Sequence, residues 1–415
     1  MNPNPVVLVT MDAVRADHLS CYGYKRIRTL NIDKISQQGV TFDNCITASS
    51  LTPVSHASIL TGNYPNKHTV RDPFGFVRTK TLAEILKDRG YRTAGFTGID
   101  FLSSRSNFNA GFDFFDEPSE DTSWHRKKFE DKKTGTEIDS IWGNWWVDKM
   151  LKWIENNHNS NFFVWGHYFE CHVPADRWLL ESGLIKEGRL SEWNYYDAKI
   201  ECMDENLFAP LITLLKKLEL WDDTVFVVMS DHGETFDEHP HKDSWCQHQS
   251  VYNTDLRIPL IIKNKRLRKG IRIKDMVRSI DVVPTVLSLL DMDTDLKFDG
   301  VNLEPMINGK EKISNLAYSE EMYELRGDGA LQAIQSMSFK LIRNNTLKQE
   351  EFYDLQNDPE EKNNLIGEEM WSKEIERFRK ILDRFTETRE KAKEIYSEQE
   401  KEKIKARLRS LGYID

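Results

Sequence analysis

The sequence predicts an α/β fold, in which a mostly parallel sheet carries helices on both faces and a small antiparallel sheet and a long helix follow at the C-terminus. Short β-branched and aliphatic runs alternate with amphipathic segments, as they do in βαβ units. Near residue 312 the segments become short, mixed and separated by turns. A length of 415 residues also exceeds what one core usually holds. We therefore expect an α/β domain over residues 1–311 and a C-terminal subdomain over residues 312–415.

The N-terminal part of the chain shows the strand and helix alternation most clearly. Val6 to Thr10 is an apolar run rich in valine, as expected for a central strand covered on both faces. Asn31 to Phe42 indicates an amphipathic helix that stops at Gly39 and continues as a strand. Thr81 to Thr97 repeats this order, with Gly90 as the stop.

The middle of the chain continues the alternation after a segment of unusual composition. Residues 117–160 are first polar and then rich in tryptophan, and we expect Trp145, Trp146 and Trp153 to pack a helix onto the sheet, with an aromatic substrate wall as the alternative. Further strands are expected at Phe162–Tyr168, Thr224–Met229 and Leu260–Ile262, and helices at Tyr195–Leu220 and Ile280–Leu290. Trp371 to Arg409 predicts a highly charged helix with a narrow buried stripe.

Composition narrows the possible partners of this protein. Hydrophobic residues make up 39% and charged residues 30%, which is typical of a globular protein. The net charge of -10 argues against nucleic acid or an anionic membrane as a partner. No run approaches the ~18 apolar residues of a transmembrane helix. The start of the chain lacks a signal-peptide pattern, and the five cysteines are scattered without a CxxC pair, so we expect reduced thiols and a cytoplasmic protein. The sequence does not indicate an oligomeric state.

Three places in the chain combine residue types suited to chemistry. Thr52 lies in a proline-containing turn before a short apolar helical run, where helix N–H groups favour an anion, although a helix cap is the simpler interpretation of a lone threonine. Asp12 follows the first strand, and Asp231 and His232 follow a later one. Ligands gather at the carboxyl ends of strands in open α/β sheets, so we expect these residues to meet there.

Several motifs, taken in order, resemble the sulfatase-like branch of the alkaline phosphatase superfamily over nearly the whole chain. The matching stretches are Val9–Leu19 with Cys21–Tyr24, Thr61–His68, His167–His172, Ser230–Glu234, Glu238-His239, Arg257–Ile262, Asp281–Thr285, Phe298–Gly300, Tyr353–Pro359 and Leu408–Ile414. The resemblance implies an alkaline-phosphatase-like fold and a metal-dependent catalytic domain over residues 1–311. It also implies a small anionic ester as substrate.

The nucleophile position departs from the sulfatase pattern. Members of that family carry Cys or Ser in a C/S-x-P-S-R pattern and convert this residue to formylglycine, whereas this chain has Thr52-Pro-Val-Ser-His56. Threonine cannot give the same aldehyde, and His56 occupies the place of the arginine. An unmodified threonine is similar to the phosphodiesterase branch, where it attacks phosphorus.

The resemblance implies a divalent cation held by Asp12, Thr52, Asp231 and His232. These donors favour Zn²⁺ or Mn²⁺, with Ca²⁺ or Mg²⁺ possible. His172 and His248 would then face the transferred group and protonate the leaving oxygen, and His56 completes the expected catalytic set. In an alternative arrangement a second cation binds Glu170 or His172 together with His248. His239 and His241 are further candidates in the same loop.

Three functions remain open from the sequence. The first is hydrolysis of a phosphate mono- or diester, or transfer of its phosphoryl group, with Thr52 as the metal-activated nucleophile. The second is hydrolysis of a sulfate ester by unmodified Thr52, as in arylsulfatases. The third is a degenerate family member that only binds an anion. The higher charge of a transferring phosphoryl group favours the first.

Overall fold

The computed structural model describes residues 4–99, 101–117, 127–130, 137–140, 145–172, 192–236, 250–311, 316–323, 330–386, 397, 399 and 402. Its main sheet has eight strands in the order β10-β2-β9-β8-β1-β7-β3-β4. The strands are β1 (Val6–Met11), β2 (Val40–Ile46), β3 (Arg92–Thr97), β4 (Phe114–Asp116), β7 (Phe162–Tyr168), β8 (Val225–Ser230), β9 (Arg257–Lys263) and β10 (Ile271–Arg278). Only β9 among them runs against its neighbours, so the sheet is mostly parallel, as predicted.

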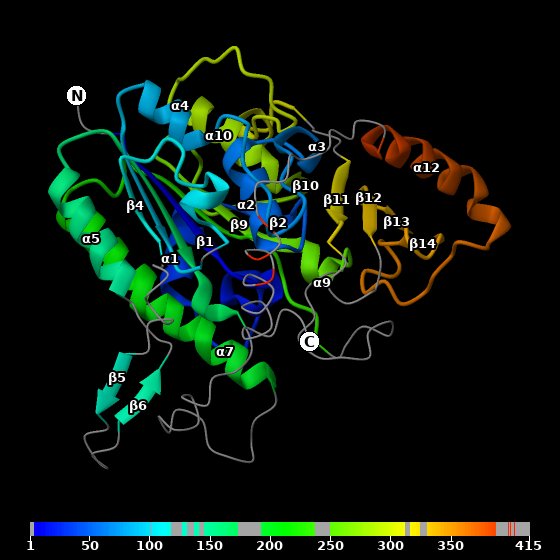
Figure 1. Cartoon of the computed structure of the whole chain (residues 1–415), viewed down its shortest axis with the longest axis horizontal. Coiled ribbons are helices and arrows are strands. Elements are labelled where there is room, and N and C mark those ends of the chain that lie inside the picture. The colour runs from blue at the N-terminus through cyan, green and yellow to red at the C-terminus, as the bar shows by residue number, and fades with distance from the viewer. Residues whose placement is uncertain are drawn as a thin grey trace.

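Helices cover both faces of this sheet (Figure 1). Side chains of β1 alternate between two cores, with Val6 and Leu8 on one face and Val7 and Val9 on the other. The first face packs against α2 (Thr52–Thr61), α4 (Leu82–Asp88) and α10 (Val282–Leu289). The second packs against α1 (Leu30–Gln38), α5 (Trp145–Asn157), α7 (Glu192–Met203) and α8 (Ala209–Lys217). Three short helices, α3 (Pro65–His68), α9 (Asn253–Leu256) and α11 (Glu304–Ile307), complete the set around the main sheet within the described residues.

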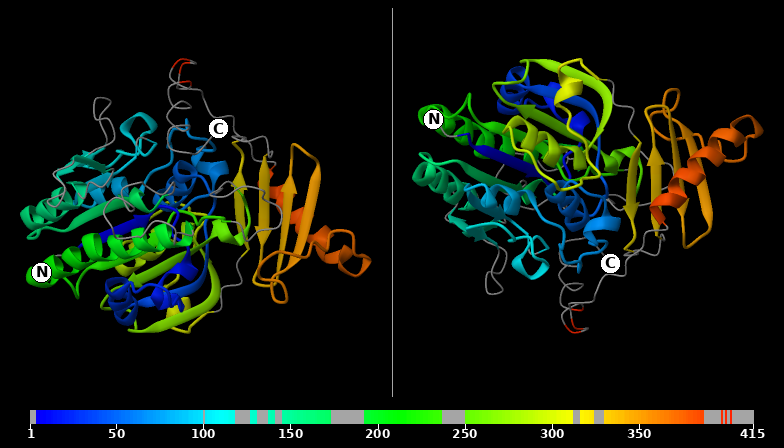
Figure 2. Two further views of the ribbon diagram at one scale, coloured as in Figure 1. Left: turned by 90° about the horizontal axis from the view of Figure 1, so that it is seen from below. Right: turned by 90° about the horizontal axis from the view of Figure 1, so that it is seen from above.

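The C-terminal region forms a second layer at one side of the molecule (Figure 2). Its antiparallel sheet runs β11-β12-β13-β14, formed by β11 (Ala317–Glu321), β12 (Leu331–Gln335), β13 (Phe339–Asn344) and β14 (Gln349–Asp354). Helix α12 (Ser372–Thr386) packs on it. The expected small sheet and C-terminal helix are thus confirmed, although most of the helix predicted beyond Thr386, up to Arg409, lies outside the described residues. The domain boundary at residue 312 stays a prediction. A further hairpin, β5 (Lys127–Glu130) with β6 (Glu137–Ser140), lies in the tryptophan-rich region.

Two details differ from the sequence-based expectation. The helix expected over Tyr195–Leu220 contains a π-helical turn at Asp204–Phe208, which separates α7 from α8. Pro210 follows this turn and has no N–H to donate to a carbonyl four residues earlier, so a wider turn relieves the conflict. The edge strand β10 was not predicted, because Ile271–Arg278 mixes charged and apolar residues.

The packing of α5 agrees with the sequence-based expectation. Trp146 is buried against Tyr168, and Trp153 lies edge-on to Phe162, so these two tryptophans do pack α5 onto the sheet. No helix among the described residues is both long and apolar enough to cross a bilayer. The four cysteines that the structure describes, at 21, 45, 171 and 202, are free thiols.

Candidate active site and metal centre

Three neighbouring strands deliver the candidate residues to one edge of the sheet. Strand β1 lies between β7 and β8 and is parallel to both. Asp12 directly follows β1, and Asp231 and His232 directly follow β8. His167 lies near the end of β7, where the register pairs it with Thr10. Because carboxyl ends of parallel strands meet at the same edge, residues more than 200 positions apart in sequence become neighbours.

Helix α2 brings Thr52 to the same edge from another direction. Thr52 is the first helical residue, no side chain caps this end of the helix, and all ten residues of α2 are buried. The Ser55 hydroxyl donates to the backbone carbonyl of Asp231 at 2.7 Å, which ties the first turn of α2 to the loop after β8. At the other end, Gly62 adopts a φ of 68° that terminates the helix.

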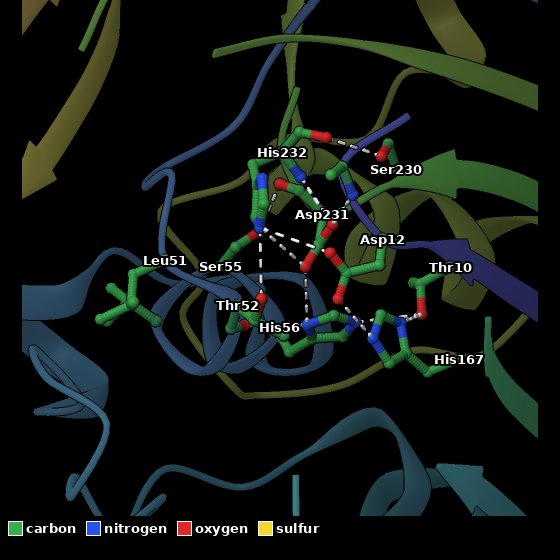
Figure 3. Close-up of polar contacts among 12 residues, drawn as sticks. Thr10, Asp12, Leu51, Thr52, Ser55, His56, His167, Ser230, Asp231 and His232 are labelled. Atoms are coloured by element: carbon green, nitrogen blue, oxygen red, sulfur yellow. Dashed lines mark hydrogen bonds and ion pairs between the residues drawn. The ribbon is translucent and has the colours of Figure 1, made fainter. Parts of the chain in front are cut away.

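Asp12, Thr52, Asp231 and His232 form one buried cluster (Figure 3). His232 is at its centre: its Nε2 atom lies 3.2 Å from Thr52 Oγ1, 3.5 Å from Asp231 Oδ2 and 3.8 Å from Asp12 Oδ1. The Nδ1 atom of the same ring lies 2.8 Å from the carbonyl oxygen of Gly233, which can only accept, so Nδ1 carries a hydrogen. The predicted metal ligands are therefore all brought together, with donor atoms that converge.

Two carboxylate oxygens in this cluster are buried without a hydrogen-bond partner among the residues that the structure describes. They are Asp12 Oδ1 and Asp231 Oδ2, the oxygens that face His232. The second oxygen of Asp231 is satisfied by the backbone N–H groups of Ala13 and His232, at 3.2 Å and 2.8 Å. A buried unpaired carboxylate oxygen is costly. Together with one hydroxyl and one imidazole nitrogen, these oxygens form a donor set that fits a divalent cation such as Zn²⁺ or Mn²⁺.

Burial and mutual charge shift the pKa values of the three titratable groups in the cluster. Burial and the neighbouring Asp231 carboxylate raise the pKa of Asp12 well above its usual range. Burial alone would also raise the pKa of Asp231, but His232, His56 and His167 together lower it. Burial opposes protonation of His232, yet the Asp231 and Asp12 carboxylates raise the pKa of its imidazole. The carboxylates of Asp12 and Asp231 thus both favour a positive charge on the imidazole of His232.

His56 lies next to the cluster, one helical turn after Thr52, with both ring nitrogens engaged. Its Nδ1 donates to the carbonyl oxygen of Thr52 at 2.8 Å, and its Nε2 lies 3.0 Å from Thr10 Oγ1. Its ring also lies 3.6 Å from Asp231 Oδ2. Burial and the nearby His167 lower the pKa of His56 to about 3, so the ring is neutral. The catalytic role predicted for His56 stays a prediction.

The sequence interpretation missed His167 as a site residue. Its Nε2 lies 3.2 Å from Asp12 Oδ2, and its Nδ1 lies 3.1 Å from Thr10 Oγ1. Its position at the end of a buried strand, five residues before the chosen His172, was the available signal. What the sequence lacked was the strand order that makes β7 the neighbour of β1.

The remaining candidates lie around or outside the described cluster. The His172 ring stacks on Phe169 with centroids 5.4 Å apart, and its carbonyl oxygen accepts from Lys199 at 2.9 Å. Glu170 accepts from the Trp146 indole at 3.3 Å, and burial raises the pKa of its carboxyl to about 7. The candidates His239, His241 and His248 lie outside the described residues, so their placement stays a prediction.

Comparison with known proteins supports the family resemblance. A family model described as Sulfatase matches residues 4–292, and one described as N-sulphoglucosamine sulphohydrolase, C-terminal, matches residues 241–391. An N-acetylglucosamine-6-O-sulfatase of Bacteroides thetaiotaomicron is 23% identical, over 92% of this chain and 86% of the relative. An arylsulfatase of Clostridium perfringens is 24% identical, over 94% of this chain and 95% of the relative.

Solved structures show the same fold. A structure of BT4656 in complex with D-glucosamine-2-N,6-O-disulfate aligns with a TM-score of 0.75 and 20% identity, over 94% of this chain and 98% of the other. The phosphonate monoester hydrolase of Silicibacter pomeroyi aligns with a TM-score of 0.72 and 18% identity, over 93% and 96% of the two chains. Because the Sulfatase model spans the whole of the main sheet and the cluster at its edge, the chain belongs to the sulfatase family.

Proposed function

We propose that this hydrolase of the sulfatase family cleaves a phosphate mono- or diester, with Thr52 as an unmodified nucleophile. The observation that carries the proposal is the position of Thr52 Oγ1, which lies 3.2 Å from His232 Nε2 in the cluster that holds two unpartnered carboxylate oxygens. A hydroxyl placed there can be a donor to a cation and a nucleophile at the same time. When bound, a divalent cation would lower the pKa of the Thr52 hydroxyl and offset negative charge on the transferred group.

The residues of this chain supply the rest of the reaction. The Thr52 hydroxyl gives up its proton to solvent and Thr52 Oγ1 forms a bond to phosphorus, while the bond from phosphorus to the ester oxygen breaks and the departing oxygen takes up a proton. His172 is the described candidate for that proton donor. Water then cleaves the bond from phosphorus to Thr52 Oγ1, which restores the hydroxyl and releases phosphate from a monoester substrate, or a phosphate monoester from a diester. Ser55 and His56 keep the first turn of α2 in place through their bonds to the carbonyls of Asp231 and Thr52.

Phosphate is favoured over sulfate because of charge. A transferring phosphoryl group has more negative charge on its equatorial oxygens than a sulfuryl group, so it gains more from a doubly charged cation. Threonine in place of a residue convertible to formylglycine is consistent with this preference. Hydrolysis of a sulfate ester by unmodified Thr52 is the second candidate, and the names of most relatives favour it.

One preparation tests both candidates. Turnover of an aryl phosphate, a bis-aryl phosphate and an aryl sulfate is measured after removal of cations and reloading with Zn²⁺, Mn²⁺ or Ca²⁺. We expect phosphate esters to be cleaved fastest, and Thr52→Ala to abolish turnover while Thr52→Ser keeps a measurable fraction. Mass spectrometry of acid-quenched enzyme should find phosphothreonine at position 52.

Three outcomes separate the alternatives. A faster reaction with the aryl sulfate supports the second candidate. Equal turnover by wild type and Thr52→Ala rules out Thr52 as the nucleophile. No turnover with any cation supports a binding protein without catalytic activity.

A further inference from the structure

The hydrogen-bond network around Thr10 determines which nitrogen of His167 carries a hydrogen. The indole N–H of Trp165 donates to Thr10 Oγ1 at 3.1 Å, and the two imidazoles of His56 and His167 contact the same oxygen at 3.0 Å and 3.1 Å. One hydroxyl therefore faces three nitrogen atoms but has a single hydrogen to give. Only one of the two imidazoles can receive it.

The backbone settles which imidazole that is. His56 Nδ1 faces the carbonyl oxygen of Thr52, which only accepts, so the single hydrogen of the neutral ring is on Nδ1 and its Nε2 must accept. The hydroxyl hydrogen of Thr10 consequently points to His56. The remaining contact, at 3.1 Å, is satisfied only if His167 Nδ1–H donates to Thr10 Oγ1.

This assignment leaves a lone pair on His167 Nε2, which faces Asp12 Oδ2 at 3.2 Å. Two electron-rich atoms at this distance repel each other unless a proton or a cation lies between them. His232 shows the same arrangement from the other side, since its Nδ1 hydrogen is held by Gly233 and its Nε2 faces Asp12 Oδ1. Histidine ligands of metal ions typically donate the hydrogen of their other ring nitrogen to such an acceptor.

We propose that His167 is a further ligand of the cation site, so that two imidazoles, His167 and His232, flank Asp12 in the loaded protein. The proposal rests on the cation site of the proposed function but not on the reaction. Thr10, His56 and Trp165 act as positioning residues, because they fix the tautomer of His167 without contacting the cation. His56 is excluded as a ligand in this arrangement, since neither of its nitrogens has a lone pair available.

A second imidazole changes which cations the site prefers. Imidazole nitrogen suits Zn²⁺, while Ca²⁺ prefers a shell of oxygens. The loss of His167 should therefore weaken Zn²⁺ binding much more than Ca²⁺ binding. That selectivity distinguishes a ligand from a residue that merely supports the fold, because general damage to the site would weaken both cations alike.

The test measures cation binding in three variants by chelator competition. His167→Asn keeps an N–H donor toward Thr10 and removes the Nε2 lone pair. We expect Zn²⁺ affinity to fall about 100-fold, which is the largest effect typical of residues that hydrogen-bond to a metal ligand. Thr10→Val removes the hydroxyl that fixes the hydrogen of His167 on Nδ1. This variant should lower Zn²⁺ affinity about 10-fold. His68→Asn is the matched control: this buried imidazole has both nitrogens occupied, by Ser58 and by the backbone of Val70, and its loss should leave Zn²⁺ affinity unchanged.

A spectroscopic readout on the wild-type protein does not depend on any variant folding. Pulsed EPR of the Mn²⁺-loaded chain counts coordinated imidazole nitrogens, and we expect two. A single imidazole coupling would overturn the proposal, as would a Zn²⁺ affinity of His167→Asn within about 2-fold of wild type. The contact between His167 and Asp12 would then be explained by a shared proton. A wild-type chain that binds neither Zn²⁺ nor Mn²⁺ would overturn the proposed function as well, so the two failures are distinguishable.

Discussion

Replacement of Asp12 by asparagine should make the metal-free protein more stable, although it destroys the candidate site. Within the described part of the chain, Asp12 Oδ1 is buried without a hydrogen-bond partner, close to the equally unpartnered Asp231 Oδ2. An unsatisfied buried polar group costs about 1–3 kcal/mol, and more for a charged one. Asp12→Asn removes one negative charge and supplies an N–H donor at the same position. We expect a gain of about 1–3 kcal/mol in the free energy of unfolding in the presence of EDTA.

The sign of the pH dependence follows from the raised pKa of Asp12. The unfolded carboxyl titrates near 3.8, whereas the folded one holds its proton to a higher pH. Between these two values the folded state binds more protons, so the wild type loses stability as the pH rises. The advantage of Asp12→Asn should therefore be absent below about pH 3.8 and grow above it, by at most about 1.4 kcal/mol per pH unit.

The same substitution should remove the stabilisation that a cation gives. At a free Zn²⁺ concentration of about 1,000 times the Kd, the wild type gains about 4.1 kcal/mol. Asp12→Asn should gain much less, because it lacks the carboxylate that completes the donor set. The net result is a crossover, with the variant more stable in EDTA and the wild type more stable in Zn²⁺.

Urea denaturation with and without Zn²⁺ measures this crossover. The matched control is Asp197→Asn, because Asp197 is an equally buried aspartate whose oxygens are bonded to His18 and Tyr24 at 2.8 Å. That control should lose stability in EDTA and keep its response to Zn²⁺. The reasoning would be refuted if Asp12→Asn were less stable than wild type in EDTA at neutral pH, or equally stabilised by Zn²⁺.

Three further predictions concern the fold around the site. Burial lowers the pKa of His68 to about 3, against 6.5 in the unfolded chain. The free energy of unfolding of the wild type should therefore fall by up to about 1.4 kcal/mol per pH unit below pH 6.5. In urea melts at several pH values, His68→Asn should show a pH slope that is smaller by one proton. Gly233→Ala should cost at least about 3 kcal/mol of unfolding free energy in EDTA, because a Cβ atom would lie 2.0 Å from the carbonyl oxygen of Thr254. Lys340→Met should cost about 3–5 kcal/mol, since it leaves Glu361 buried without the ion pair at 2.7 Å, and adding Glu361→Gln should recover part of that loss in thermal melts.

The sequence predicted the parts of the fold that depend on local patterns. Val6 to Thr10 indicated a strand covered on both faces, and β1 has that position at the centre of the sheet. The placement of Asp12 and Asp231 at strand ends followed from the same local patterns. Both residues meet in the structure because β1 and β8 are neighbours and parallel.

What the sequence could not supply was the order and direction of the strands. Nothing local in Arg257–Lys263 distinguishes an antiparallel strand from a parallel one, and β9 is the antiparallel one. His167 was overlooked for the same reason, because its partners Thr10 and Asp12 come from a strand more than 150 residues away. The π-helical turn before Pro210 was a different omission, because the proline that explains it is visible in the sequence but the hydrophobic stripe was interpreted without it.

An anomalous-scattering map of crystals loaded with Zn²⁺ or Mn²⁺ is the most direct test of a cation that activates an unmodified threonine. We predict a peak about 2.0–2.2 Å from the carboxylate oxygens of Asp12 and Asp231 and from His232 Nε2, with Thr52 Oγ1 in the same coordination shell. Electron density at residue 52 should be that of an ordinary threonine. A peak remote from Asp12, Asp231 and His232, or a Thr52 side chain turned away from the ion, would contradict the account.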